Sequence, residues 1–137
     1  MNNNFHENRE MAVTFGLENV PEEDMKVNKK FRMHVFKFQR FMATIVDILP
    51  QADRTDELVQ IIRLVGRQHC HIKSMSFTAD KWLLFKNSLI SVLCDANSQR
   101  KVYESWSRLL SFVIYEMKDA YLKYVCVLSV FIKLCKI

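Results

Sequence analysis

The hydrophobic residues of the chain recur at steps of three and four positions in four separate stretches, which is the spacing of one face of an α-helix. The first stretch covers residues 28–49, and Pro50 directly after it predicts the end of a helix. The others begin near Asp56, Thr78 and Gln99. Acidic residues in the first turns of the second and third stretches suit the positive end of a helix dipole. The pattern predicts an all-α fold.

The apolar faces of these four helices supply the expected core. The first face is formed by Phe31, His34, Val35, Phe38, Phe41, Met42, Ile45, Val46 and Leu49. The second is formed by Leu58, Ile61, Ile62, Val65 and His69, and the third by Trp82, Phe85, Leu89, Val92 and Leu93. The fourth is formed by Val102, Trp106, Leu109, Leu110, Val113, Met117 and Tyr121. All of these side chains are expected to be buried.

The composition agrees with long, uninterrupted helices. Half of the 137 residues are apolar, and the chain contains only two Gly and two Pro. A chain of this length suits one compact domain. The formal net charge of +5 is spread along the chain without a basic stripe, which argues against a nucleic-acid-binding protein. The sequence motifs of phosphate-binding loops, nucleophile elbows and HExxH metalloproteases do not occur, so no enzyme activity is predicted.

The cysteines and the apolar segments indicate the cellular compartment in which the protein is expected. Cys70, Cys94, Cys126 and Cys135 show no CxxC spacing, and no signal peptide is recognisable. Free thiols in a reducing, cytoplasmic compartment are therefore predicted. The most apolar stretch, YVCVLSVFI at residues 124–132, is shorter than the ~20 residues that a membrane-spanning helix needs. A soluble protein is expected.

Two histidines stand out because each occupies an otherwise apolar stripe: His34 on the first helix and His69 on the second. A buried imidazole without a hydrogen-bond partner costs about 1–3 kcal/mol. The partner is either a backbone carbonyl, as for an ordinary core histidine, or a metal centre inside an apolar pocket. Zinc needs four converging ligands, whereas the consecutive His69, Cys70 and His71 point about 100° apart on a helix. Haem iron needs only one axial imidazole and an apolar slot, which fits better.

Three segments carry a family resemblance: FGLENVPEED at residues 15–24, FRMHVFKF at 31–38 and LVGRQH at 64–69. Together they resemble the globins, and within them the nerve-type and invertebrate branch that includes neuroglobin and globin X. The resemblance runs from about Phe5 to Tyr121, and Trp106 matches the tryptophan of the last globin helix. It implies a globin-like helical fold that is N-terminally shortened, because the first helix and most of the second are missing before Phe15.

The same resemblance implies a haem b site. His69 falls on the proximal ligand of the iron, and His34 falls on the distal histidine, a possible sixth ligand. The other implied haem contacts are Phe15, Phe38, Val65, Trp82 and Phe85. The implied function is reversible binding of O₂ or another diatomic ligand such as CO or NO, for oxygen transport or storage, sensing or redox signalling. The alternative is a degenerate, haem-free helical interaction protein derived from a globin.

The resemblance also divides the chain into three parts. Residues 1–14 are interpreted as a polar segment with the remnant of an early globin helix, and residues 15–122 as the haem-binding domain. Residues 123–137 form an apolar C-terminal tail outside the family pattern. Large apolar patches seldom stay bare. The tail is therefore expected to continue the last helix, to cover apolar surface or to mediate self-association.

Overall fold

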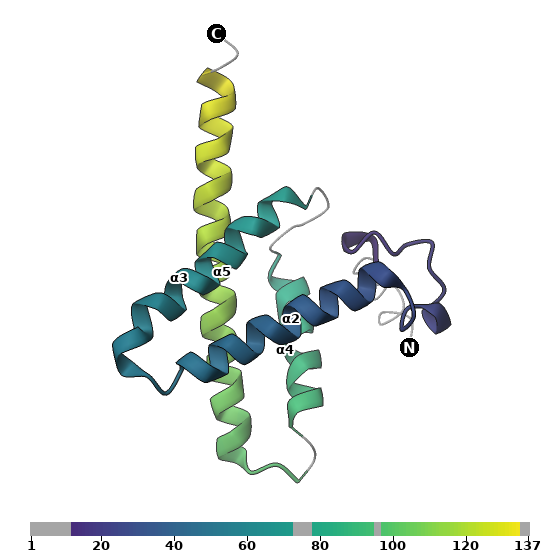
Figure 1. The fold of residues 1–137 in the computed structure, drawn as a ribbon, viewed down its shortest axis with the longest axis vertical. Helices are drawn as coiled ribbons and strands as arrows, with labels where there is room; N and C mark the ends of the chain where they lie inside the picture. The colour runs from purple at the N-terminus through teal and green to yellow at the C-terminus, as the bar shows by residue number, and fades with distance from the viewer. Residues whose placement is uncertain (1–11, 73–77, 95–96, 135–137) are drawn as a thin grey trace. The chain divides into compact units, whose positions relative to one another are not determined.

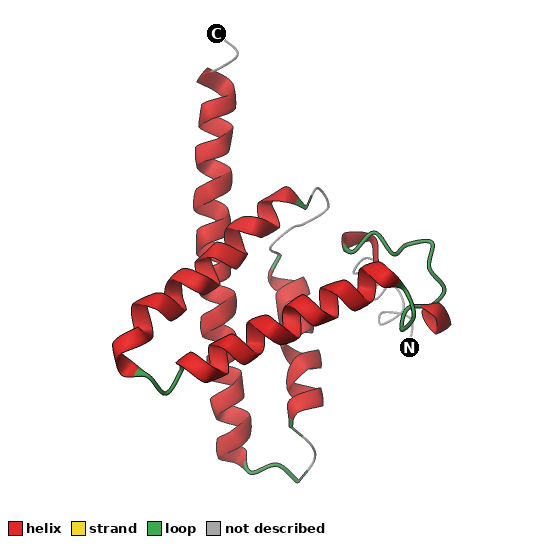
Figure 2. Ribbon diagram, viewed as in Figure 1, coloured by secondary structure: helices red, strands yellow, loops and turns green. Residues whose placement is uncertain are grey.

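A computed structural model of the chain describes residues 12–72, 78–94 and 97–134. Within these ranges the chain forms helices and loops and contains no strand (Figure 2). The predicted all-α fold is confirmed for them. The chain separates into two compact units, Met1–Leu58 and Val59–Ile137.

The first unit is built on one long helix, α2, which spans Lys29–Ile48. It begins after Asn28, whose side-chain oxygen accepts hydrogen bonds from the backbone N–H groups of Lys30 and Phe31 at 2.9 and 3.2 Å. Two short 3₁₀ turns flank it, η1 at Glu22–Asp24 and η2 at Ala52–Arg54. The helix predicted over residues 28–49 is confirmed to within one residue at each end.

The apolar face of α2 is less buried than its pattern predicts. Ile45 and Ile48 are the buried residues of this helix, and Ile48 lies outside the predicted stripe. Val46 and Leu49 are 44% and 51% exposed, and His34 is also exposed, so the prediction of burial was wrong at these three positions. The reason is that the described neighbours of α2 within this unit are short turns, which cover only part of a 20-residue helix.

The second unit contains most of α3 and all of the later elements. The helix α3 spans Thr55–Gln68 and continues into the 3₁₀ turn η3, His69–His71. The helices α4, Ala79–Leu93, and α5, Arg100–Leu134, pack against each other and run in opposite directions (Figure 1). Lys86 Nζ of α4 donates a hydrogen bond to Ser111 Oγ of α5 at 2.7 Å. Thr78, near which this helix was predicted to begin, is the N-cap residue of α4, although its side chain makes no capping hydrogen bond.

The core of the second unit follows one stripe of α5. Its buried apolar residues are Ile62, Ile90, Leu110, Val113, Met117 and Ala120. Burial was predicted wrongly for Val92, Leu93 and Val102, which are 82%, 38% and 41% exposed. These three residues lie in the last turn of α4 and the first turn of α5, at the end of the helix pair, where few neighbouring side chains remain to cover them.

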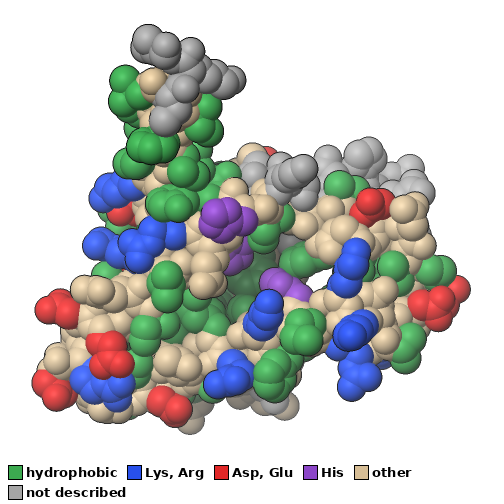
Figure 3. All heavy atoms as spheres, turned by 45° about the horizontal axis from the view of Figure 1, so that its top comes forward, with side chains coloured by type: hydrophobic (Ala, Val, Ile, Leu, Met, Phe, Trp, Pro, Cys, Tyr) green, Lys and Arg blue, Asp and Glu red, His purple; other side chains and the backbone are tan. Residues whose placement is uncertain are grey.

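The last helix continues well beyond Tyr121, the last residue of its predicted apolar face, because α5 reaches Leu134. The described tail therefore extends the helix. The buried stripe of α5 also continues at the same steps of three and four residues as Tyr124, Val127, Phe131 and Leu134. The last three of these are 65%, 64% and 64% exposed, and hydrophobic side chains gather on this part of α5 (Figure 3). Among the described residues, no helix has the length and apolar character needed to cross a membrane.

Replacing Leu110 with Ala is expected to lower the free energy of unfolding by about 2–5 kcal/mol, because a buried leucine leaves a cavity when it is truncated. Leu110 is 1% exposed, whereas Leu83 of α4 is 57% exposed and provides a matched control. The Leu83→Ala change is expected to alter stability by about 0.5 kcal/mol or less. Urea unfolding followed by circular dichroism measures both values. Equal losses for the two variants would contradict the placement of Leu110 in the core.

Candidate functional site

His69 is the first residue of η3 and directly follows α3, so the helix ends one residue earlier than its predicted apolar stripe. Its ring nitrogen Nδ1 lies 2.7 Å from the backbone oxygen of Val65. Because a carbonyl oxygen can only accept a hydrogen bond, Nδ1 carries the proton. In the neutral ring the lone pair then belongs to Nε2.

This hydrogen bond is common to both explanations of His69. A core histidine is satisfied by such a carbonyl, and a metal-binding histidine usually donates its second ring N–H to a carbonyl or carboxylate. The His69 side chain is only half-buried. Partial exposure is unusual for a histidine whose role is to fill a core, so the local geometry suits a ligand at least as well.

The two residues after His69 face other groups. Cys70 Sγ donates a weak hydrogen bond to the backbone oxygen of Tyr121 at 3.6 Å, and the His71 ring meets the Tyr124 ring edge-on with centroids 6.4 Å apart. The three consecutive side chains of η3 thus contact three different groups. No set of three metal-ligating side chains converges within the part of the chain that the structure describes.

The Cys70 thiol is not activated. Burial raises its pKa above the ordinary value of a cysteine, so the thiol stays protonated at neutral pH. A reactive thiolate needs the opposite shift, which neighbouring positive charge or a helix N-terminus provides. Cys70 therefore acts as a small, half-buried side chain that donates one weak hydrogen bond.

Two predicted haem contacts lie together on α4. The rings of Trp82 and Phe85 are 5.7 Å apart between centroids and meet edge-on, with 76° between their planes. This is a favourable arrangement for two aromatic rings. Both side chains are half-buried. They present an aromatic surface in the same unit as Val65 and His69.

The remaining predicted site residues belong to the first unit. The rings of Phe15 and His34 are 4.5 Å apart between centroids and tilted by 56°. Phe15 is half-buried, and His34 is exposed on α2. Phe38 lies four residues further along α2 and is half-buried. The structure thus brings Phe15 and His34, which are far apart in the sequence, into direct contact.

A close crossing of α3 and α5 supports the segment that carries His69, and the sequence analysis did not identify it. At the buried Gly66, an added Cβ would lie 2.8 Å from Cα of Met117, so the two backbones touch. Nearby, Arg63 Nε donates to Glu116 Oε2 at 2.7 Å. The signal in the sequence was Gly66 itself, because a glycine inside a helical pattern often marks close packing.

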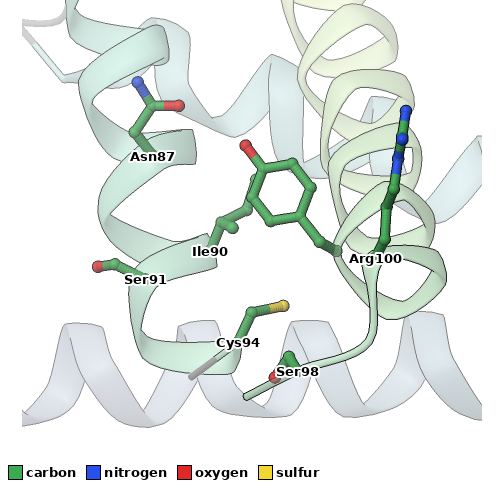
Figure 4. A pocket seen from close by; sticks show the side chains of 7 residues that line it. Asn87, Ile90, Ser91, Cys94, Ser98 and Arg100 are labelled. Atoms are coloured by element: carbon green, nitrogen blue, oxygen red, sulfur yellow. The ribbon is translucent and has the colours of Figure 1, made fainter. Parts of the chain in front are cut away.

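A separate pocket of about 620 Å³ lies where α4 ends and α5 begins (Figure 4). It is lined by Asn87, Ile90, Ser91, Cys94, Ser98, Arg100 and Tyr103. None of the predicted haem contacts lines it. It is therefore distinct from the segment around His69.

The sequence profile of the globin family matches residues 1–117. The chain belongs to the globin family. This globin is 24% identical over 114 residues to the globin-related protein glb-13 of Caenorhabditis elegans, an alignment that covers 82% of the chain but only 39% of that relative's length. No solved structure matches the chain.

Family membership confirms the predicted all-α, globin-like fold. Globins bind haem and, through it, diatomic gases, and the family is generally not enzymatic. The matched region contains all seven residues predicted to contact haem, from Phe15 to Phe85. It ends at Met117, so the part of α5 from Lys118 onwards lies outside the match.

Proposed function

We propose that this globin holds haem b through His69 as the proximal ligand and reversibly binds O₂ or another diatomic gas for transport, storage, sensing or redox signalling. The hydrogen bond from His69 Nδ1 to the Val65 carbonyl carries the proposal. It places the proton on Nδ1 and the lone pair on Nε2, and a neutral imidazole binds iron through such a lone pair. It also orients the ring, as a second bond usually does for metal-binding histidines. Haem iron supplies the gas-binding chemistry.

The surroundings of His69 suit a porphyrin, which needs apolar and aromatic contacts. Val65, one turn before His69, and the aromatic pair Trp82 and Phe85 are all half-buried in the second unit. We assign the remaining contacts to Phe15 and Phe38.

We further propose that His34 serves as the distal residue and binds the iron as sixth ligand. Its side chain is exposed on α2, and its ring contacts the ring of Phe15, another predicted haem contact. Phe38 lies four residues further along the same face of α2. A side chain of this size would crowd a small external ligand, which favours a protein ligand at that position.

We also propose that two copies of this globin associate through the extended stripe of α5, formed by Tyr124, Val127, Phe131 and Leu134. Their spacing is that of a two-helix seam, and two copies of one such stripe are complementary to each other. The charges of this region lie on other faces of the helix, where Lys123 Nζ pairs with Asp119 Oδ2 at 2.8 Å. A stripe without charge fits an equally apolar partner surface.

Three finer assignments belong to the same proposal. We place the chain in the nerve-type and invertebrate branch, because of the segments at residues 15–24, 31–38 and 64–69. We keep residues 15–122 as the haem-binding domain, between the segment 1–14 and the tail 123–137. We infer a cytoplasmic location, because Cys70, Cys94 and Cys126 are free thiols, as expected in a reducing compartment.

Substituting His69 with Ala is expected to abolish the axial bond and most haem retention. The wild-type chain mixed with haemin should give a sharp, stoichiometric Soret band, which absorbance titration and gel filtration measure. His71→Ala is the matched control, because His71 is exposed and its ring faces Tyr124. Equal haem loss in both variants would show that His69 is not the ligand. Diffuse absorption in the wild type would favour the haem-free interaction protein instead.

Substituting His34 with Leu is expected to change the ferrous spectrum of the reconstituted protein. The wild type should show the split visible bands of low-spin, bis-histidyl haem. The variant should be high-spin and five-coordinate, and it should bind carbon monoxide faster, because no internal ligand has to leave first. Met33→Leu, at the neighbouring exposed position of α2, should leave the spectrum unchanged. A wild-type spectrum that is already high-spin, and insensitive to both changes, would remove His34 from the iron.

Substituting Phe131 with Glu is expected to abolish self-association, because it places a charge in the stripe. Ile132→Glu is the matched control: Ile132 is 53% exposed, comparable to Phe131, but lies off the stripe. Sedimentation equilibrium over a range of concentrations should show dimers for the wild type and Ile132→Glu, and monomers for Phe131→Glu. A wild type that stays monomeric throughout, or equal effects of the two variants, would contradict the proposed interface.

A further inference from the structure

The crossing of α3 and α5 forms a seam that runs directly beside His69. The name covers six residues, three from α3 and η3 and three from α5, that meet where these elements cross. On one side they are Arg63, Gly66 and Cys70, and on the other side they are Glu116, Met117 and Tyr121. Steps of three and four residues place the first three on one face of α3 and η3. The seam therefore runs along residues 63–70, the segment that contains His69, over about two helical turns.

The first contact of the seam is an ion pair that is unequally buried. The Glu116 side chain is 11% exposed, and that of Arg63 is 44% exposed. A carboxylate removed from water needs a charged or hydrogen-bonding partner, and Arg63 Nε provides one at 2.7 Å. The same hydrogen bond raises the pKa of Arg63 above its ordinary value. The pair therefore resists rotation of α3 against α5.

The second contact sets the separation of the two helices. A Cβ at Gly66 would lie 2.8 Å from Cα of Met117 and 2.9 Å from its carbonyl carbon, both closer than atoms can approach. Because the contact is between backbones, no side chain can rotate to relieve an added methyl group. The distance between α3 and α5 at this point is fixed by the absence of a side chain.

The third contact is made by Cys70, the residue directly after the proposed iron ligand His69. Cys70 Sγ donates a weak hydrogen bond to the Tyr121 carbonyl at 3.6 Å. His69 is the preceding residue, and its ring is bonded to the carbonyl of Val65, next to Gly66. The position of the imidazole is thus linked to the seam in two ways: by the peptide bond from His69 to Cys70, and by the hydrogen bond from its ring to Val65, the residue before Gly66.

We propose that this seam sets the position of the His69 imidazole relative to the haem, with Gly66 and Glu116 as positioning residues. This inference rests on the proposed function. A shift of α3 along α5 would move Val65 and Cys70 together. The His69 ring, which lies between them in the chain and is bonded to Val65, would then tilt, and its bond to the haem iron would change. Glu116 and Met117 are the last two residues of the family match, and Tyr121 lies just beyond it.

The test uses the haem-reconstituted full chain in a His34→Leu background, in which the ferrous iron keeps only the proximal ligand. Gly66→Ala is expected to shift the iron–histidine stretching band in resonance Raman spectra and to change the carbon monoxide association rate several-fold. Leu110→Ala is the control for general destabilisation, because it truncates a buried core side chain that is not one of the six seam residues. It should lower the melting temperature and leave the band in place.

Glu116→Gln is the second variant, in case the added methyl group of Gly66→Ala prevents folding. It keeps the size and hydrogen-bonding capacity of the side chain but removes its charge, so a smaller shift of the same band is expected. An unchanged band in every folded seam variant, with normal haem content, would overturn the positioning role.

A cofactor-free measurement separates failure of the seam from failure of the proposed function. In apo-protein with Cys94, Cys126 and Cys135 replaced by Ser, Gly66→Ala should speed maleimide labelling of Cys70 several-fold, whereas Leu110→Ala should not. A parent chain that takes up no haem would overturn the proposed function, and the positioning role with it, even if labelling shows the seam intact. Faster labelling without a band shift would show a purely structural seam and would also overturn the positioning role.

Discussion

The backbone contact between α3 and α5 at Gly66 is the constraint on which the second unit depends. A glycine in the middle of a helix costs about 1 kcal/mol relative to alanine. Here it allows Met117 to approach until the two backbones touch. That approach brings Glu116 within reach of Arg63 and the Tyr121 carbonyl within reach of Cys70. One residue without a side chain thus determines which groups meet along the whole seam.

The chemistry around His69 follows from this packing. The three side chains of η3 diverge toward Val65, Tyr121 and Tyr124, which suits a single axial imidazole better than a cluster of ligands on one metal ion. Haem, the cofactor that globins typically bind, needs one such axial histidine.

The helix α5 combines two properties in one stripe. Between Leu110 and Ala120 the stripe is buried in the core of the second unit, and from Val127 onwards the same stripe is largely exposed. Nothing in the local pattern marks this change, because the steps of three and four residues continue without interruption. Burial along a helix depends on where its neighbours end, and the spacing of its own side chains carries no such information.

The sequence by itself determined the helices and the candidate chemistry. Periodicity and Pro50 predicted α2 to within one residue at each end, because these signals act between residues close in the chain. His34 and His69 stood out for the same local reason, as polar residues in apolar stripes. Only the tertiary structure decided that His34 is exposed and that Arg63 meets Glu116, 53 positions away. Such pairings depend on which helices cross and how closely, and that is fixed by the packing of whole elements.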